Sequence, residues 1–483
     1  RLRAVDVQAL DVERLAPLIG DARTRRLEQV AASVRGALGG RAILNVNSTA
    51  TGGGVAEMLQ TLVAYTRGMG VDARWLVIDG DPDFFAITKR IHNGLYGDPG
   101  DGGPLGDAER ACYETVQRRN AEELLAVVRP GDVVIVHDPQ PAGLTAAAKR
   151  AGATVLWRCH VGRDEPNEWT RRAWAFLAPY LADADGFVVS RAAFAPPFAA
   201  RERVHVIPPS IDPFSTKNAP LTETEVEHAL AYVGLLSAPD GRARVPFVRH
   251  DGSPGRITRR VDVVQAGPAP PPDAPLVVQV SRWDRMKDMA GVMSGFAAHV
   301  DRSLGAHLLL VGPAVTGVAD DPEAAAVLAE CLQTWHRLPH AARTRVHLAC
   351  TPMRDADEQA TIVNAIQHHA AVVVQKSLAE GFGLTVAEAM WKARPIVASA
   401  VGGIRDQITD GKQGLLLDDP HDLPAFGAAV ERLLRDPHAA AAMGAAARER
   451  AAAELLPDRH LERWAAVLTD QPGSCRNRTP SAG

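Results

Sequence analysis

A glycine-containing loop between an apolar strand and a short helix constrains the fold of this chain more than any other feature. Residues 371–375 (AVVVQ) form an apolar run of strand length, residues 384–391 (LTVAEAMW) carry apolar residues at helical spacing, and residues 394–398 (RPIVA) predict the next strand. This order places free backbone N–H groups and the positive end of a helix dipole at the carboxyl edge of a parallel sheet. The sequence therefore predicts an anion site at the loop from Lys376 to Gly383, with phosphate as the obvious ligand.

Two glutamates bracket this turn. Glu380 lies in the loop and Glu388 lies on the helix, more than one turn further along. Either glutamate alone is an ordinary helix-entrance or solvated charge, but Gly381 and Gly383 flank Phe382 between them, and EGFGLTVAEAM is unlike the surface of an exposed helix. Since carboxylates accept hydrogen bonds from hydroxyls, the pair predicts a ligand that carries hydroxyl groups beside its phosphate.

The segment EGFGLTVAEAM resembles the E-x7-E signature of the retaining glycosyltransferases of glycosyltransferase family 4, which have the GT-B fold. The resemblance implies that Glu380 and the backbone from Gly381 to Leu384 hold the donor sugar and the distal phosphate, and that Glu388 binds the ribose. The donor-binding residues that it implies in this segment are Glu380, Gly381, Phe382, Gly383, Leu384, Thr385 and Glu388.

Strand and helix patterns alternate through both halves of the chain. At 483 residues, the chain is too long for one ordinary core and suggests two large domains. We therefore predict an α/β protein with two doubly wound Rossmann-like domains that face each other across a cleft. This architecture resembles the GT-B fold. The predicted strands are 42–46, 73–78, 132–136, 154–157, 187–190 and 204–207, then 276–280, 307–311, 345–348, 371–375, 394–398 and 414–417.

The domain boundaries follow from composition and pattern. PPSIDP at residues 208–213 is a proline-stiffened exit from the first domain. With the roles that the resemblance implies, the predicted parts are an N-terminal acceptor-side domain (1–213), a linker and surface insertion with one helix at 223–232 (214–275), a C-terminal nucleotide-sugar-binding domain (276–455), a closing helix that packs back on the N-terminal domain (456–470) and a disordered tail (471–483). The part of the insertion at residues 241–272 fits no family motif.

Polar side chains follow the first domain's strands where those strands end. Asp138 comes just after one buried strand and His160 just after the next, so we expect both in the same crevice at the carboxyl edge of the sheet. Gly52 to Gly54 lie between the first strand and its helix without the GxGxxG or GK[ST] pattern, and allow close approach to a ligand. The resemblance implies that Gly53 and Gly54 contact the donor and that His160 lies near the anomeric carbon of the transferred sugar.

Two basic residues follow the first strand of the second domain. Arg282 and Lys287 can both reach a diphosphate, one as a guanidinium fork and one as a point charge. By the resemblance they clamp the leaving diphosphate without a metal, and no separate nucleophile is required because the leaving phosphate takes the acceptor's proton. His160, Arg282, Lys287 and Glu380 are the predicted catalytic residues.

Motifs in the first half narrow the activity. VNSTATGGGVAEMLQTL, FFAITKRIHNGL, VVIVHDPQPAGL, WRCHVG and IPPSIDPFSTKN look like the trehalose-forming branch, which includes glycosyltransferring synthases and retaining phosphorylases. The implied reaction joins glucose from UDP-, ADP- or GDP-glucose to free glucose, in one or both directions, with Asp138, His92 and Asn93 as acceptor contacts. A phosphorylase, a sugar-nucleotide epimerase and a non-catalytic binding protein remain the alternatives.

Composition excludes several other classes. The 53 basic and 57 acidic residues leave a net charge of −4, which gives no electrostatic reason to bind nucleic acid. No segment has the roughly 20 apolar residues that span a bilayer. Five cysteines without metal-ligand spacing favour a reducing cytoplasm. We expect small-molecule partners, no required cofactor and no metal; a homodimer is one possible assembly.

Overall fold

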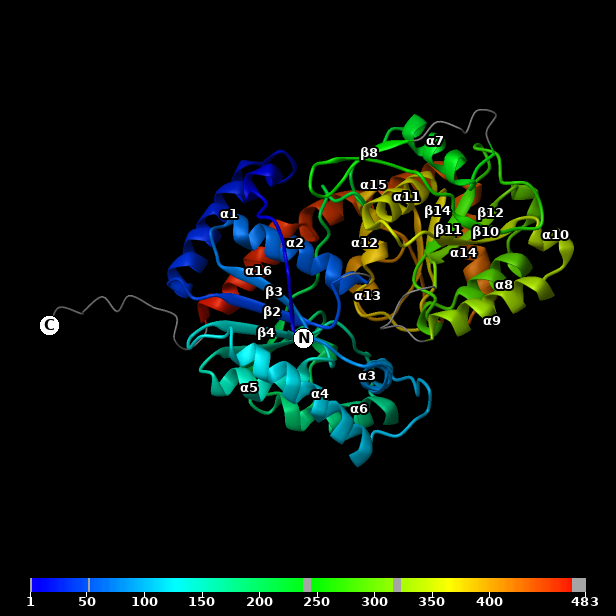
Figure 1. The fold of residues 1–483 in the computed structure, drawn as a ribbon. Helices are drawn as coiled ribbons and strands as arrows, with labels where there is room; N and C mark the ends of the chain where they lie inside the picture. Colours follow the sequence, from blue (N-terminus) through cyan, green and yellow to red (C-terminus); the bar gives the residue numbers. More distant parts are fainter. Residues whose placement is uncertain (1, 51–52, 238–244, 316–322, 471–483) are drawn as a thin grey trace. The chain divides into compact units, whose positions relative to one another are not determined.

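The computed structural model describes residues 2–50, 53–237, 245–315 and 323–470. Their contacts divide the chain into two compact units (Figure 1). Unit 1 comprises the described residues of Arg1–Ser210 and Leu455–Gly483, and unit 2 comprises those of Ile211–Glu454. Unit 1 is therefore built from both ends of the described chain.

Unit 1 contains a seven-stranded sheet in the order β1-β3-β2-β4-β5-β6-β7. All neighbouring pairs are parallel except β1 with β3, which is antiparallel. The order reverses at β2, so the loops after β2 and β4 open at one point of the carboxyl edge, where doubly wound sheets bind ligands. The strands are β1 (Arg3–Val5), β2 (Ile43–Asn47), β3 (Ala73–Val77), β4 (Val133–His137), β5 (Thr154–Cys159), β6 (Gly186–Val189) and β7 (Val204–Val206).

Helices cover both faces of this sheet. Buried residues of α3, α4 and α6 pack on one face, around Val134, Val136 and Trp157. On the other face α2 packs around Trp75, and α16 lies against α1 and α2 (Figure 1, red against blue). The helices are α1 (Ala16–Leu38), α2 (Gly54–Gly68), α3 (Pro82–Leu95), α4 (Asp107–Leu125), α5 (Thr145–Arg150), α6 (Glu168–Leu181) and α16 (Pro457–Asp470).

Unit 2 repeats this architecture with a second seven-stranded sheet, in the order β10-β13-β12-β11-β14-β15-β16. The edge pair of β10 with β13 is antiparallel and the other neighbouring pairs of this sheet are parallel. The order reverses at β11, so the loops after β11 and β14 open beside each other. The strands are β10 (Asp262–Val264), β11 (Leu276–Val280), β12 (His307–Pro313), β13 (Val346–Thr351), β14 (Val372–Gln375), β15 (Ile396–Ser399) and β16 (Leu415–Leu417).

The core of unit 2 gathers apolar residues of its sheet with those of α8, α9 and α14, including Phe296, Trp335 and Phe426. Trp283, which is fully buried, anchors the loop after β11 by donating from Nε1 to the carbonyl of Pro313 at 2.8 Å. The helices are α7 (Glu223–Val233), α8 (Met289–His299), α9 (Ala324–Arg337), α10 (His340–Arg343), α11 (Ala356–His369), α12 (Leu384–Trp391), α13 (Ile404–Gln407), α14 (Leu423–Arg435) and α15 (Pro437–Glu454).

The structure confirms the two doubly wound sheets and places every predicted strand within two or three residues of its predicted bounds. Helix α1 and strand β1 were not predicted, because their polar sequence hides the apolar side that α1 buries at Leu27, Val30 and Val34. The regular backbone of α1 is interrupted at Gly20, whose φ of 74° and ψ of 168° are not helical.

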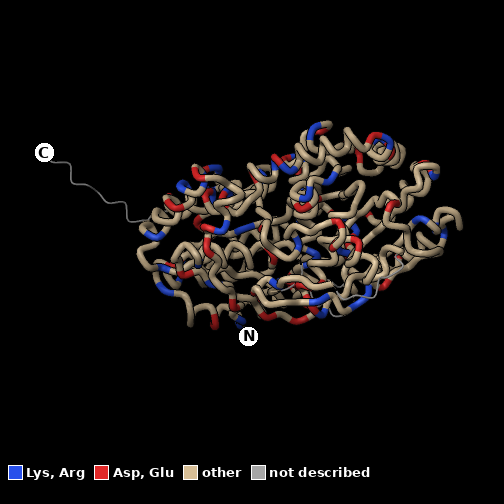
Figure 2. The backbone as a smooth tube through the Cα atoms, turned by 90° about the horizontal axis from the view of Figure 1, so that it is seen from above, with Lys and Arg blue, Asp and Glu red and all other residues tan. Residues whose placement is uncertain are grey.

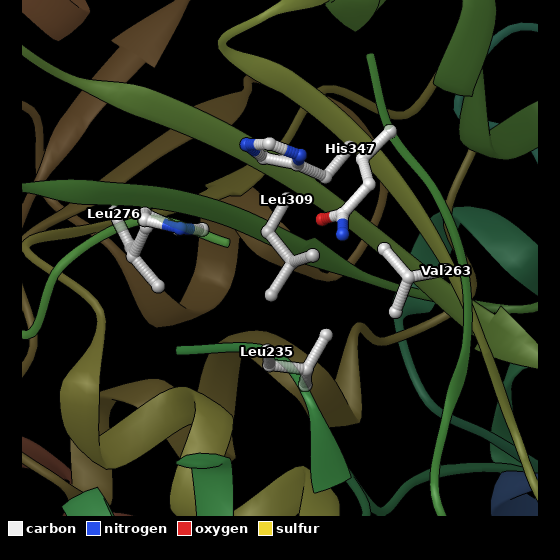
Figure 3. A pocket seen from close by; sticks show the side chains of 7 residues that line it. Leu235, Val263, Leu276, Leu309 and His347 are labelled. Atoms are coloured by element: carbon white, nitrogen blue, oxygen red, sulfur yellow. The ribbon is translucent and has the colours of Figure 1, made fainter. Parts of the chain in front are cut away.

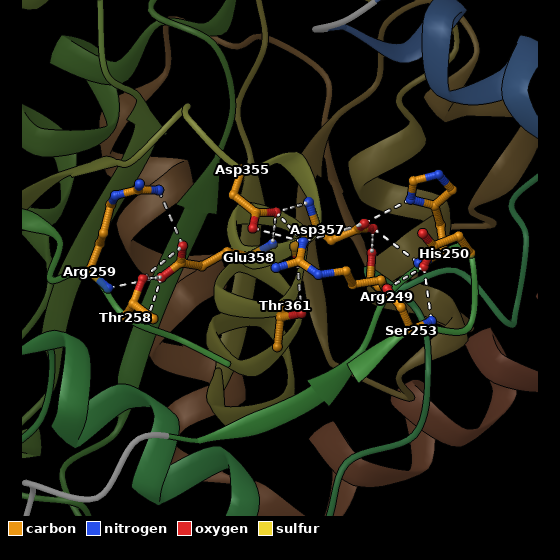
Figure 4. A network of polar contacts seen from close by, with 11 residues as sticks. Arg249, His250, Ser253, Thr258, Arg259, Asp355, Asp357, Glu358 and Thr361 are labelled. Carbon is orange, nitrogen blue, oxygen red and sulfur yellow. Dashed lines mark hydrogen bonds and ion pairs between the residues drawn. The ribbon is translucent and has the colours of Figure 1, made fainter. Parts of the chain in front are cut away.

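The segment 214–275 differs from the linker and surface insertion predicted for it. Its helix α7 packs on α11, and its strand β10 extends the sheet of unit 2. A small hairpin, β8 (Pro246–Val248) with β9 (Pro254–Arg256), is tied by polar contacts to the start of α11 (Figure 4). Arg249 pairs with Asp355 at 2.7 Å, and the backbone N–H of Thr258 donates to Glu358 at 2.5 Å. The described part of this segment is therefore integral to unit 2.

Charged residues of both signs are scattered along the chain trace (Figure 2). Among the described residues, no helix is both long enough and apolar enough to cross a membrane.

Candidate functional site

The loop between β14 and α12 is held by its backbone. Gly383 precedes α12 with a φ of 88°, a conformation that favours glycine. The N–H of Gly403 donates to the carbonyl of Gly381 at 3.2 Å, and Gln407 Nε2 donates to the carbonyl of Phe382 at 2.5 Å. A Cβ on Gly403 would lie 2.7 Å from Phe382 Cα, so this close approach requires glycine. The predicted strand, glycine turn and helix are confirmed, with Glu380 in the loop and Glu388 on the helix.

Glu380 is the centre of a charged cluster at this edge of the sheet. Lys287 Nζ donates to Glu380 Oε2 at 2.6 Å, and Ser377 Oγ donates to the same oxygen at 3.0 Å. The side chains of Lys287 and Glu380 are only 15% and 8% exposed. Arg282 lies on the same loop after β11, 3.5 Å from Asp284, and its side chain is 41% exposed. The structure thus brings Lys287 and Glu380 together and leaves the guanidinium of Arg282 accessible.

A second ion pair supports the loop after β11. Asp288, with a φ of 46°, accepts at the start of α8 from the N–H of Gly291 and also pairs with the fully buried Lys376. Lys376 Nζ also donates to the carbonyl of Pro420 at 2.7 Å. Because Lys376 precedes the Glu380 loop and Asp288 follows Lys287, this pair ties together the two segments that carry the charged cluster.

Glu388 lies in a third ion pair that the sequence analysis missed. Lys217 Nζ lies 3.0 Å from Glu388 Oε1, and Gln367 Nε2 donates to Oε2 at 3.3 Å. The carboxylate is only 2% exposed. Lys392 donates to Asn218 Oδ1 at 3.0 Å, and burial lowers its pKa to about 7, although the charge of Glu388 opposes that shift. The only signal for Lys217 in the sequence was its place in the motif IPPSIDPFSTKN.

In unit 1, Asp138 and His160 lie at the ends of the neighbouring strands β4 and β5, as predicted. Asp138 has a φ of 65°, and its Oδ1 accepts from the backbone N–H of His160 at 2.7 Å. Burial raises the pKa of Asp138 to about 7, while the His160 N–H and the Arg158 charge act in the opposite direction. The structure therefore brings these two residues into direct contact.

A buried polar cluster that the sequence did not reveal lies behind His160. His137 Nδ1 lies 3.2 Å from His160 Nε2, and His137 Nε2 lies 3.0 Å from Asn45 Oδ1. Arg158 is opposite His137 in the β4–β5 register and is fully buried, with its Cζ 5.9 Å from the ring of Trp464. The signal that could have found this cluster is alternation: these polar residues share one face of otherwise apolar strands.

The other predicted residues of unit 1 occupy separate elements. Gly53 precedes α2 with a φ of 85° and Gly54 begins that helix, whereas Gly52 lies outside the described residues. His92 and Asn93 lie in the last turn of α3. His92 packs edge-on against Tyr96, and Asn93 is 6% exposed.

Two further findings bear on ligand chemistry. No group of three or more potential metal ligands occurs among the described histidines, cysteines and acids. Unit 2 has a small pocket away from the predicted residues (Figure 3), and its side chains are mostly apolar. The lining residues are Leu235, Val263, Gln265, Pro270, Leu276, Leu309 and His347.

Comparison with known proteins gives matches to both halves of the chain. Residues 45–196 match the family "Trehalose synthase, N-terminal domain", and residues 265–450 match "Glycosyl transferases group 1". The chain is 33% identical to the trehalose synthase of Pyrococcus horikoshii, over 96% of this chain and 97% of that protein. It is 35% identical to the trehalose synthase of Rubrobacter xylanophilus, over 90% and 91%. A trehalose phosphorylase of Pleurotus pulmonarius is 25% identical over 77% of this chain and 49% of its own length.

Solved structures share the fold at low identity. The α,α-trehalose 6-phosphate synthase of Burkholderia multivorans superposes with a TM-score of 0.61 at 16% identity, covering 89% of this chain and 97% of its own. HepE of Anabaena, solved with UDP and glucose, gives a TM-score of 0.59 at 14% identity, covering 89% and 100%.

Two mostly parallel, doubly wound sheets, together with these matches, define a glycosyltransferase of the GT-B class. More narrowly, the identity to proteins matched along almost their whole length shows that this chain belongs to the trehalose synthase family. It is accordingly a trehalose-related hexosyltransferase.

Proposed function

We propose that this enzyme is a retaining glucosyltransferase that transfers glucose from a nucleoside diphosphate glucose to free glucose and forms α,α-trehalose. The observation that carries the proposal is the Lys287–Glu380 pair beside the N-terminus of α12. It combines a cation suited to a diphosphate with a carboxylate suited to sugar hydroxyls. The two trehalose synthases that the chain matches over nearly their whole length support the choice of product.

On the donor side, the bond from the anomeric carbon to the phosphate oxygen breaks while negative charge develops on the diphosphate. Lys287, the accessible Arg282 and the N–H groups at the start of α12 would stabilise that charge. Removal of one such donor typically costs about 3 kcal/mol of transition-state stabilisation. The acceptor's hydroxyl forms the new bond to the same carbon, and its proton passes to the leaving phosphate, so no metal and no covalent intermediate are required.

We assign the ribose to Glu388, although Lys217 and Gln367 already contact both of its oxygens. A carboxylate has roughly four acceptor positions, so two remain for the ribose hydroxyls. Lys217 would then hold the carboxylate in orientation. HepE, a protein of the same fold, is described in complex with UDP and glucose, which supports a nucleotide-sugar donor for this chain.

We assign the transferred sugar to His160, and the acceptor to Asp138, His92 and Asn93. The contact between Asp138 and the His160 N–H supports a shared role for the first two. With a pKa raised to about 7, Asp138 would be able to accept a hydrogen bond from a glucose hydroxyl in its ionised form above that pH.

The test offers UDP-, ADP- and GDP-glucose with free glucose and identifies the products by NMR. We expect a non-reducing disaccharide with both anomeric carbons in the α configuration, released with the matching nucleoside diphosphate. Isomerised donor with glucose unconsumed would indicate an epimerase. Glucose 1-phosphate formed from trehalose and inorganic phosphate would indicate a phosphorylase, and intact donor after long incubation would contradict catalysis altogether.

A further inference from the structure

The histidine behind the predicted sugar contact is part of a hydrogen-bonded chain that begins in the interior of unit 1. Asn45 Oδ1 lies 3.0 Å from His137 Nε2, and His137 Nδ1 lies 3.2 Å from His160 Nε2. Asn45 and His137 are 2% and 1% exposed. The planes of the two imidazole rings are nearly parallel, with an angle of 8° between them. Water therefore does not compete for the bond between Asn45 and His137.

The chemistry of each atom fixes where the protons lie. An amide oxygen can only accept, so His137 Nε2 must donate to Asn45. A neutral imidazole has one N–H, so His137 Nδ1 is then an acceptor, and the proton in the next bond must come from His160 Nε2. His160 Nδ1 is left unprotonated, and it has no hydrogen-bond partner within the described residues.

The surroundings disfavour a positive charge on either ring. Arg158 is fully buried on the adjacent strand, and its guanidinium nitrogens have no hydrogen-bond partner within the described residues. Burial and this charge lower the pKa of His137 to about 3 and hold the pKa of His160 well below its usual value. Among the described residues, Asp138 is the carboxylate in contact with this chain, and it accepts from the backbone of His160 rather than from a ring nitrogen.

A third histidine, His460 on α16, is also neutral, as its hydrogen bonds show. Trp464 Nε1 donates to His460 Nε2 at 3.0 Å, so that nitrogen carries no proton. His460 Nδ1 then donates to Ser210 Oγ at 3.0 Å. The His460 ring of α16 is therefore uncharged and adds no positive charge near His137 and His160.

We propose that Asn45 and His137 are positioning residues that hold His160 as a neutral imidazole protonated on Nε2, so that its Nδ1 accepts a hydrogen bond from a substrate hydroxyl. The substrate part of this inference rests on the proposed function of His160, whereas the proton positions rest on the contacts within unit 1. His160 then acts as a hydrogen-bond acceptor and not as a proton donor.

The first experiment uses the full chain labelled with ¹⁵N-histidine and reads the tautomer from long-range ¹H–¹⁵N correlations, with His160→Gln to assign the signal. We expect His160 to remain in the Nε2–H form from pH 8 to pH 5. An Nδ1–H form, or a titration near the usual value of about 6.5, would overturn the proposal. Because no substrate is present, this result does not depend on whether the chain makes trehalose.

The second experiment uses Asn45→Asp to reverse the donor and acceptor in the hydrogen bond between His137 and His160. A carboxylate beside Nε2 favours the charged form of His137, which must donate from both nitrogens and so forces His160 into the Nδ1–H form. We expect an acidic limb in kcat/KM of about tenfold per pH unit below the new pKa, together with the tautomer change. The matched control is Asn47→Asp, on the same strand and 3% exposed, since Asn47 bonds Trp75 and not a histidine. An Asn45→Asp enzyme that keeps the wild-type tautomer and pH profile would contradict the positioning role of Asn45 and His137. If this variant does not fold, the wild-type spectrum alone decides.

Discussion

The carboxyl edges of the two sheets are built from the same backbone pattern, but their buried polar groups differ in charge. In unit 1, the cluster behind His160 is a chain of uncharged rings beside one buried cation, Arg158. In unit 2, lysines pair with both of the predicted glutamates, Lys287 with Glu380 and Lys217 with Glu388. The difference indicates a division of labour, because uncharged groups orient hydroxyls without ion-pair competition, whereas paired cations can be redirected to a phosphate.

The largest effect that we expect is on kcat, when a cation of unit 2 is removed. Lys287→Met removes the positive charge that we assign to the leaving diphosphate and leaves Glu380 without its 2.6 Å partner. We expect kcat for trehalose formation to fall about 10²–10³-fold. Steady-state kinetics would measure this.

The matched control is Arg285→Met, in the same short 3₁₀ segment, where the arginine contacts the exposed Glu330 instead. It should retain wild-type activity. A Lys287→Met enzyme within a few-fold of wild type would show that the charged pair is structural only.

In unit 1, the pH dependence of the free energy of unfolding tests the protonation state of Asp138. Its pKa is raised by burial to about 7, so between its unfolded value near 4 and pH 7 the native state binds the extra proton. This group's contribution to the free energy of unfolding therefore falls as pH rises through that window, by up to about 1.4 kcal/mol per pH unit. Asp138→Asn should abolish that part of the slope, measured by urea unfolding at pH 4 to 8.

The exposed Asp183→Asn, in the same unit, serves as the control and should leave the slope unchanged. Equal slopes for wild type and Asp138→Asn would mean that the carboxyl group is ionised in the native state throughout.

A smaller effect separates the ion pair of Glu388 with Lys217 from its proposed binding of the ribose. Lys217→Met leaves a carboxylate that is 2% exposed without its cation, and we expect a loss of about 3 kcal/mol in stability. Adding Glu388→Gln should recover part of that loss, because a neutral amide needs no counter-ion. A double-mutant cycle by chemical unfolding measures the coupling, with nucleotide affinity measured in parallel. Additive losses would contradict the pairing.

The smallest effect concerns α16, the helix that carries His460 and Trp464. Arg23 on α1 binds Asp458 on α16 through two bonds of 2.7 and 2.8 Å, and Asp458 is 4% exposed. Asp458→Asn should cost about 1.5 kcal/mol, because the amide nitrogen of asparagine cannot accept a hydrogen bond and one of the two bonds from Arg23 is lost. Hydrogen exchange of α16 amides would measure it, and unchanged protection would show that apolar packing alone holds the helix.

The strands and the Glu380 loop could be predicted because their information is local. The run AVVVQ, the glycines and the apolar spacing of LTVAEAMW each specify a conformation within a few residues. Residues such as Asp138 and His160 could be paired because the ends of neighbouring parallel strands meet at one edge.

The buried polar cluster, the partner of Glu388 and the β8–β9 hairpin could not be predicted, because no local pattern in the sequence specifies them. Asn45, His137 and Arg158 come together only through strand register, since β2 and β5 both neighbour β4. Lys217 reaches Glu388 across more than 170 residues of sequence. The hairpin β8–β9 lacked strand signal because its two strands have three residues each and are rich in proline, glycine and arginine.

The return of α16 to unit 1 has a consequence for biosynthesis. The sheet of unit 1 is translated first, yet the helix that supplies His460 and Trp464 to its buried face is made only after the whole of unit 2. Since chains emerge from the ribosome at roughly 5–20 residues per second, the part of that face that α16 covers lacks this helix for many seconds. Until α16 is made, the contacts of His460 and Trp464 with that face are absent, so unit 1 can be completed only after every residue of unit 2 has been synthesised.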